Sequence, residues 1–250
     1  MNILLIKVTL MPLVIGLVTL VSRRWGHQAG GLIASLPWIA GPILLFLILE
    51  RGKAFGIQAV PGILIGIAAL VGFCYCYARL APHLSGIWTL LIAYAVFVAI
   101  ALLFTAIDLA LLPSYGMVMG SVLLTLRYFP EPAIAATAVK RLPYDLPIRM
   151  VVATLFVMGI TGLAAVLGPT WSGILTPFPI ITSILAVFTH YLQGSSASIV
   201  TLRGIVMGLL GFTTFLFLQA FFLPRFSIAE SFFFALLING TINFIVSKTA

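Results

Sequence analysis

The chain overlies itself without a gap when it is shifted by 142 positions. Most of the matched residues are glycines and prolines, which fix backbone geometry and fill little space. The recurring pairs are Gly26 and Gly168, Gly31 and Gly173, Pro37 and Pro179, Gly52 and Gly194, Gly62 and Gly204, Gly66 and Gly208, Pro82 and Pro224, and Ser85 and Ser227. Any fold for this chain must therefore build one structural unit twice.

The scarcity of charge determines the solvent of that fold. Hydrophobic residues make up 62% of the chain and charged residues only 7%, whereas a soluble domain carries about 25% charged residues. With a mean hydropathy of +1.25, the chain needs a lipid bilayer around most of its surface. The net charge of +8 does not indicate nucleic acid as a partner, because no basic run is interleaved with aromatic residues.

The sequence lacks the motifs of catalysis and of metal binding. It contains no HExxH or GxSxG motif, no phosphate-binding loop and no cluster of metal ligands. Cys74 and Cys76 lie in an apolar stretch, and we interpret them as apolar filler residues. We therefore expect neither an enzyme nor a bound cofactor.

Apolar runs of about 20 residues, enough to cross a bilayer, divide each unit into four predicted helices. They are Ile3 to Val21, Gly30 to Leu49, Ala59 to Leu80 and Ile87 to Ile107, then Pro147 to Leu167, Ser172 to Leu192, Ile199 to Phe222 and Ile228 to Val246. Between the units, Leu109 to Tyr128 could form a ninth span. If it crosses the bilayer, the repeats are inverted; if it does not, eight spans remain and the repeats are parallel.

We predict an all-α, polytopic transmembrane bundle of about nine spans, with two four-helix inverted repeats joined by a middle helix. The first repeat covers residues 1–108, the linking helix and cytoplasmic loop cover 109–142, and the second repeat covers 143–250. We favour nine spans because Leu109 to Leu126 would otherwise leave an almost uncharged run outside the bilayer.

The basic residues predict an orientation, because they concentrate on the cytoplasmic side. With nine spans, one side holds only Lys7, Arg51, Lys53 and Arg225, and the other side holds the remaining nine of the 13 Lys and Arg residues. This predicts a bacterial inner-membrane protein with its N-terminus outside and its C-terminus in the cytoplasm. An eight-span arrangement also divides the basic residues nine to four, with different members on each side. The rule therefore does not choose between eight and nine spans.

The second predicted helix of each unit carries the strongest candidate for a binding site. Pro37, followed by Trp38, and Pro179, preceded by Thr176, lie well inside these helices. A proline removes a backbone donor, and broken helices are tolerated at membrane depth where they line a cavity. The alternative is a simple kink.

Other polar residues extend the predicted substrate-binding set, each with a structural alternative. Lys7 and Arg149 are equivalent under the shift and would suit an anionic solute, or they extend to the lipid headgroups. Asn239 and Asn243 share one helix face and bind a solute or hold helices together. His190 is predicted either to relay protons or to be a structural residue at the membrane interface. No carboxylate lies at mid-membrane, so proton coupling through a buried acid is not indicated.

The second unit carries a basic residue early in its first helix, a partial GLxPxFP motif, an HY pair and an LR pair, formed by Arg149, Gly173, Phe178, Pro179, His190, Tyr191, Leu202 and Arg203. In this pattern it resembles the GlpM-like family of small bacterial inner-membrane proteins, whereas in the first unit only Lys7, Gly31 and Pro37 match. Family members are about half this length, so the chain resembles a fused pair. The architecture is also similar, by analogy, to drug/metabolite transporters.

Together these features predict a transporter that moves a small polar or anionic solute by alternating access. Membrane lipids would be its other partners, nucleic acid would not be one, and a homodimer is compatible with the sequence. The alternative is a membrane protein that binds or flips lipid-linked intermediates or scaffolds an envelope complex. A polar cavity between the units would favour transport, and a groove open to lipid would favour lipid handling.

Overall fold

The computed structural model describes residues 36–38, 40–107, 110–132 and 144–249, together with Thr9, Pro12, Leu13 and Gly16. Within these residues the chain forms helices and no strand, so the predicted all-α fold is confirmed. The helices are α3 (Ala40–Arg51), α4 (Lys53–Leu80), α5 (Gly86–Thr105), α6 (Leu111–Arg127), α7 (Asp145–Leu175), α8 (Ile180–Gln193), α9 (Ser195–Phe222) and α10 (Ile228–Thr249).

Helix length and apolar surface identify a multi-pass membrane protein. In the described part of the chain, α4, α5, α7, α9 and α10 are long and apolar enough to cross a bilayer. On α5 and α10 large apolar side chains face outward, including Trp88 (62% exposed) and Phe233 (59% exposed). Helices α6 and α8 are shorter, and Ile3 to Val21 lies mostly outside the described residues. Nine spans therefore stay a prediction.

The two halves repeat the same backbone geometry at the predicted spacing. Gly52 and Gly194 both have φ +88°, a conformation that favours glycine, and they separate α3 from α4 and α8 from α9. Helices α4 and α9 both contain 28 residues. Thr89 and Ser231 each donate a side-chain hydrogen bond to the carbonyl four residues earlier. The duplicated sequence thus forms duplicated structure from α3 to α5 and from α8 to α10.

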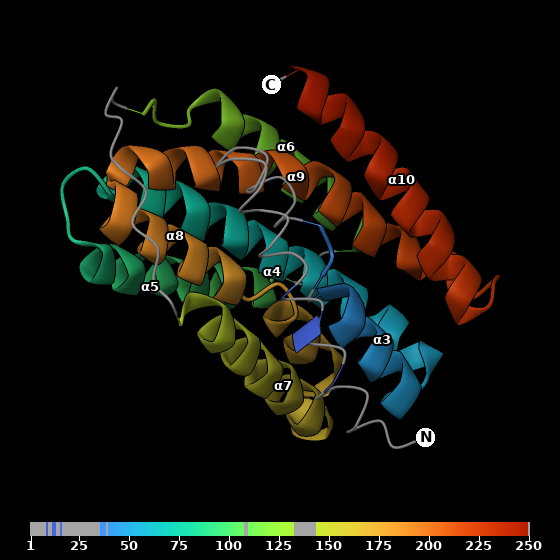
Figure 1. The fold of residues 1–250 in the computed structure, drawn as a ribbon. Coiled ribbons are helices and arrows are strands. Elements are labelled where there is room, and N and C mark those ends of the chain that lie inside the picture. The colour runs from blue at the N-terminus through green and yellow to red at the C-terminus, as the bar shows by residue number, and fades with distance from the viewer. Residues whose placement is uncertain are drawn as a thin grey trace.

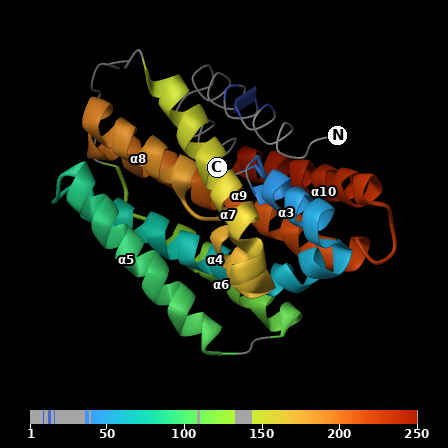
Figure 2. The ribbon, with the colours of Figure 1, turned by 90° about the horizontal axis from the view of Figure 1, so that it is seen from below.

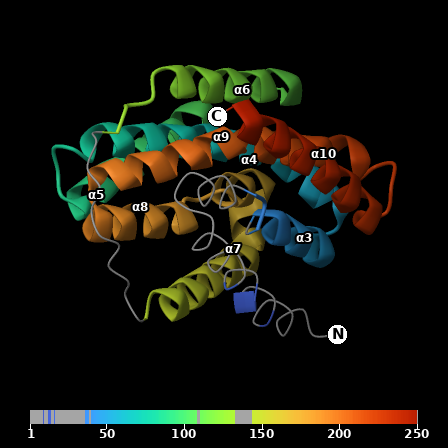
Figure 3. The ribbon, with the colours of Figure 1, turned by 45° about the horizontal axis from the view of Figure 1, so that its top comes forward.

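Helices α4 and α9 lie side by side at the centre and run in opposite directions (Figure 1). Lys53, at the start of α4, donates hydrogen bonds to the Leu223 and Phe226 carbonyls just beyond the end of α9. Near the other end of α4, Tyr77 bonds His190, shortly before α9 begins. Helix α5 packs along α4 and α10 packs along α9. Figure 3 shows α6 across this central pair, with α7 and α3 on the opposite side.

Small residues allow α4 and the end of α7 to approach closely. A Cβ atom on Gly62 would lie 2.3 Å from the Thr170 carbonyl oxygen, and one on Gly66 would lie 2.3 Å from that of Ile174. Glycines four residues apart are a common means of close helix packing in membranes. This contact fixes the end of α7, and hence the connection to α8, against the centre of the bundle.

The structure changes the predicted boundaries around α7 and α8. The predicted helix Ser172 to Leu192 is divided, because α7 ends at Leu175 and α8 begins at Ile180. Helix α7 also bends at Gly168, whose φ of +68° is not helical, and Pro169 follows it as the first residue of the next helical segment, a favoured position for proline. The view from below shows how α7 turns from the outside of the bundle toward α4 (Figure 2). The predicted unit boundaries at 108/109 and 142/143 lie outside the described residues.

Candidate functional site

Two equivalent turns precede α3 and α8. The Trp38 amide donates to the Leu36 carbonyl over 2.7 Å, and the Ile180 amide donates to the Phe178 carbonyl over 2.8 Å. The carbonyls of Pro37 and Pro179 then accept from the amides four residues later, Gly41 and Ser183. The expected interruption near Pro179 is present, since residues 176–179 are not helical.

A central cavity of about 50 Å³ lies between these two turns. Its lining comes from Leu36, Trp38 and Ala40 on one side, from Thr176, Pro177, Phe178, Ile181 and Thr182 on the other, and from Leu70, Ile205, Leu209 and Phe212 on α4 and α9. Leu36 is equivalent to Phe178, and Leu70 to Phe212, under the 142-residue shift. The cavity therefore lies where matching parts of the two halves meet.

The polar side-chain groups in the described lining of the central cavity are the hydroxyls of Thr176 and Thr182 and the indole N–H of Trp38. Thr176 donates its hydroxyl to the Ser172 carbonyl over 2.7 Å, which satisfies it within its own helix turn. Thr182 is 8% exposed and lines the cavity from α8. No charged side chain of the described residues lines this cavity, so as described it suits a weakly polar group better than an ion.

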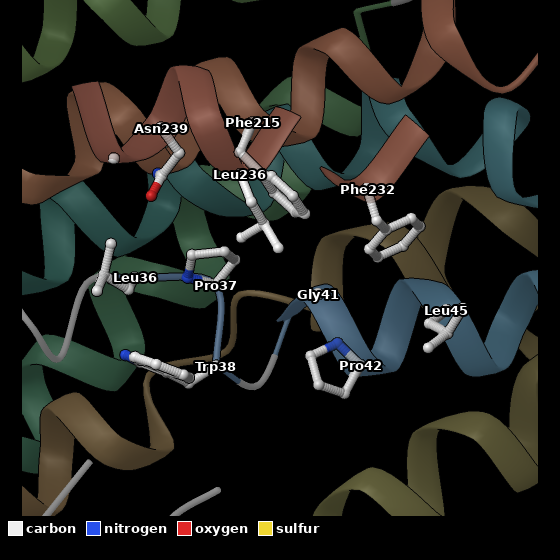
Figure 4. A pocket seen from close by; sticks show the side chains of 11 residues that line it. Leu36, Pro37, Trp38, Gly41, Pro42, Leu45, Phe215, Phe232, Leu236 and Asn239 are labelled. Carbon is white, nitrogen blue, oxygen red and sulfur yellow. The ribbon is translucent and has the colours of Figure 1, made fainter. Parts of the chain in front are cut away.

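A larger pocket of about 390 Å³ adjoins the central cavity and shares Leu36 and Trp38 with it. It lies between the start of α3 and helices α9 and α10 (Figure 4). The lining residues are Leu36, Pro37, Trp38, Gly41, Pro42, Leu45, Phe215, Phe232, Leu236, Asn239 and Gly240. Asn239 extends from α10 toward Leu36 and Pro37 and is the one amide side chain in this lining (Figure 4).

Asn239 and Asn243 form a buried polar pair between α9 and α10. Asn243 Nδ2 donates to Asn239 Oδ1 over 3.4 Å. Asn239 Nδ2 and Asn243 Oδ1 are buried and have no hydrogen-bond partner in the described part of the chain. A Cβ atom on Gly211 would lie 2.9 Å from the Asn243 amide atoms, so this glycine makes room for the pair.

The structure separates His190 from the other predicted site residues. Its Nδ1 lies 3.2 Å from the Tyr77 hydroxyl, and the two rings meet edge to face with centroids 6.0 Å apart. His190 is eleven residues beyond Pro179 on α8, about 16 Å at 1.5 Å per residue. The Tyr77 contact supports the interpretation of a structural histidine, and the sequence alone gave no sign of this partner.

The side chains of the two predicted cations lie outside the described part of the structure. Lys7 lies outside the described residues. Arg149 lies near the start of α7, about 28 Å from Gly168 by helix rise, and its side chain is outside the described part. Thus Pro37, Trp38 and Asn239 share the larger pocket, Trp38 and Thr176 share the central cavity, and Pro179 supports the turn beside it.

Sequence reasoning missed the apolar residues that give the larger pocket its shape. Leu36, Leu236 and Gly41 are unremarkable in an apolar chain, yet each differs in size from its partner under the 142-residue shift. Comparing side-chain volumes between the halves, and not only their matched glycines, would have indicated them.

The chain matches no family model, no curated protein and no solved structure.

Proposed function

We propose that this protein is a membrane transporter whose two halves form inverted repeats and move a small solute by alternating access. The observation that carries the proposal is the meeting of two equivalent turns, at Pro37 and Pro179, beside one central cavity between the antiparallel helices α4 and α9. In transporters built from inverted repeats, substrate sites lie at the repeat interface, beside discontinuous helices.

Opposite insertion of the halves requires an odd number of crossings between them, which the middle segment α6 would supply. The opposite directions of α4 and α9 support this proposal, because parallel repeats would place equivalent helices in the same direction. Arg51 and Lys53 at the start of α4 lie at the same end of this pair as Arg225, whereas Arg79 lies at the other. The proposed inner-membrane orientation, with the N-terminus outside and the C-terminus in the cytoplasm, rests on the nine-to-four division of all 13 Lys and Arg residues along the sequence, with the Arg79 end on the side of the nine.

The solute is proposed as small, and its charge is left to experiment. The anionic solute predicted from Lys7 and Arg149 depends on side chains that the described site does not include. A GlpM-like origin and a homodimer likewise stay proposals. Handling of lipid-phase molecules is the second candidate, and the apolar lining of the larger pocket favours it over scaffolding.

Uptake into proteoliposomes tests transport directly. A panel of small anions and uncharged solutes of matched size would be offered to wild type, Arg149→Ala and Thr182→Val. Arg225→Ala, at an exposed turn, and Thr201→Val, whose hydroxyl bonds its own helix, are the matched controls. We expect Thr182→Val to slow uptake about two- to twelvefold if its hydroxyl bonds the solute, and Arg149→Ala to act only on anions.

The competing results are distinct. If no solute enters faster than into protein-free vesicles, the transporter proposal is wrong. For the arrangement of the halves, cysteines placed at Ser85 and Ser227 in a chain lacking Cys74 and Cys76 should be labelled from opposite sides of the membrane. Labelling of both from one side would exclude inverted repeats.

A further inference from the structure

The two halves meet at two equivalent contacts, of which one is filled by aromatic side chains and the other is hollow. In the filled contact Phe178 of the second half stacks on Tyr94 of the first half, with ring centroids 5.4 Å apart and planes at 13°. Phe97 meets Phe178 edge to face at 5.2 Å. The Tyr94 hydroxyl donates to Ser183 Oγ over 2.8 Å. These side chains form a contiguous aromatic cluster with a satisfied polar group.

The equivalent positions at the other contact between the halves line the larger pocket and carry smaller side chains. Under the 142-residue shift, Phe178, Tyr94, Phe97 and Ser183 become Leu36, Leu236, Asn239 and Gly41. All four of these residues line the pocket of about 390 Å³. This volume falls within the range of about 300–1,000 Å³ that is usual for small-molecule sites.

A hollow with an unpaired amide is costly for a membrane fold. Removing buried side-chain volume destabilises a core, and Asn239, only 1% exposed, keeps Nδ2 without a partner among the described residues. The filled contact shows that the equivalent backbone positions accommodate large side chains. Loss of volume together with a gained amide donor is what a ligand site requires.

We propose that this pocket binds an uncharged amphiphile from the bilayer, with Asn239 Nδ2 donating a hydrogen bond to its hydroxyl or carbonyl oxygen. Asn239 Oδ1 already accepts from Asn243, so the amide group offers a donor. Among the described residues no charged side chain belongs to the lining, so an uncharged ligand suits this pocket. The inference goes beyond the proposed transport function, because it concerns the larger pocket and not the central cavity assigned to the solute.

Part of the pocket lining is exposed on the apolar surface of α10. Leu236, which is 47% exposed, and the exposed Gly240 belong to its lining. They lie on α10 among outward-facing apolar residues such as Phe233 and Leu237. A molecule dissolved in the bilayer reaches this side of α10 without crossing water, which is why we assign an amphiphile and not a water-soluble solute.

Trp38 lines the pocket and provides a direct signal of binding. In full-length protein with Trp25, Trp88 and Trp171 replaced by Phe, quenching of Trp38 fluorescence would be followed against the mole fraction of 10-bromodecan-1-ol in the micelles. 1-Bromodecane lacks the oxygen, and 10-bromodecanoate is charged at neutral pH. We expect saturable quenching that is strongest for the alcohol.

Two kinds of variant test the site. Asn239→Leu preserves most of the shape and removes the donor, so it should weaken alcohol binding about two- to twelvefold, the range of one hydrogen bond, and leave the alkane unchanged. The triple variant Leu36→Phe, Leu236→Tyr and Asn239→Phe introduces the residue types found at the filled contact and should abolish saturable quenching. Leu237→Tyr with Ile238→Phe adds similar rings at exposed positions outside the pocket and should change nothing.

The outcomes separate this inference from the transport proposal. Equal, non-saturable quenching in wild type and the triple variant would overturn the site, as would an unchanged alcohol-to-alkane preference in Asn239→Leu. If the triple variant does not fold, the alcohol-to-alkane preference of Asn239→Leu still tests the site. Saturable binding without solute movement in proteoliposomes would refute transport and leave the site intact, whereas transport without binding would refute the site alone.

Discussion

Replacing Gly66 by alanine tests the closest approach in the bundle. The added Cβ would lie 2.3 Å from the Ile174 carbonyl oxygen and 2.6 Å from Pro177 Cγ. Ordinary contact begins near 3.4 Å, and the first neighbour is backbone, so no side-chain rotation relieves the overlap. Helix α4 and the end of α7 must separate by about 1 Å, as expected for an overpacked interface.

The cost follows from this geometry. Overpacking of a tight interface costs about 1–3 kcal/mol, while alanine in place of glycine within a helix returns about 1 kcal/mol. Gly116→Ala on α6 supplies the matched control, because nothing lies within 4 Å of its added Cβ and only the helix gain applies. The difference between the two variants should therefore equal the overlap cost alone, about 1–3 kcal/mol.

Unfolding by sodium dodecyl sulfate titration, followed by circular dichroism in mixed micelles, measures this difference. Gly72→Ala is a second comparison, since its Cβ would meet the flexible Cδ1 end of Ile100 at 2.2 Å, and we expect an intermediate loss. If Gly66→Ala and Gly116→Ala are equally stable, α4 and α7 do not pack through this glycine, and the position assigned to the α7–α8 connection loses its support.

Three further perturbations address other contacts. Gly211→Ala should destabilise the protein by about 1 kcal/mol through overlap with Asn243. In an Asn243→Ala background this loss should largely disappear. The same titration measures both, and equal losses in the two backgrounds would contradict the contact. Tyr77→Phe should cost about 0.5–1.5 kcal/mol by removing its hydrogen bond to His190, and no further loss should follow in a His190→Phe background; additive losses in a double-mutant cycle would refute the pairing. Lys53→Met should lower the free energy of unfolding by about 1 kcal/mol, because the carbonyls of Leu223 and Phe226 lose a charged, partly exposed donor. The amides of the turn after α9 should then exchange faster with solvent hydrogen. Unchanged exchange would refute the bond.

The duplicated unit and its helices were readable from the sequence because glycine and proline act locally. The positive φ of Gly52 and Gly194 and the interruption beside Pro179 depend on neighbours along the chain. The long apolar runs likewise predict lipid-exposed helices from composition alone. The predicted helix end at Leu167 agrees with the break at Gly168. The predicted helix Ser172 to Leu192 was wrong, because the segment after the break ends at Leu175, where it contacts α4, and α8 begins only at Ile180.

The sequence by itself determined an all-helical membrane fold built from one unit used twice, together with a proline-interrupted helix in the second unit. Only the tertiary structure decided which residues share a site. Trp38 and Asn239 lie about 200 positions apart in the chain and meet at one pocket, while His190 pairs with Tyr77 away from it. Local residue preferences do not encode such contacts, because the contacts depend on how whole helices pack. The unequal filling of the two contacts between the halves likewise depends on side-chain volumes brought together from several helices.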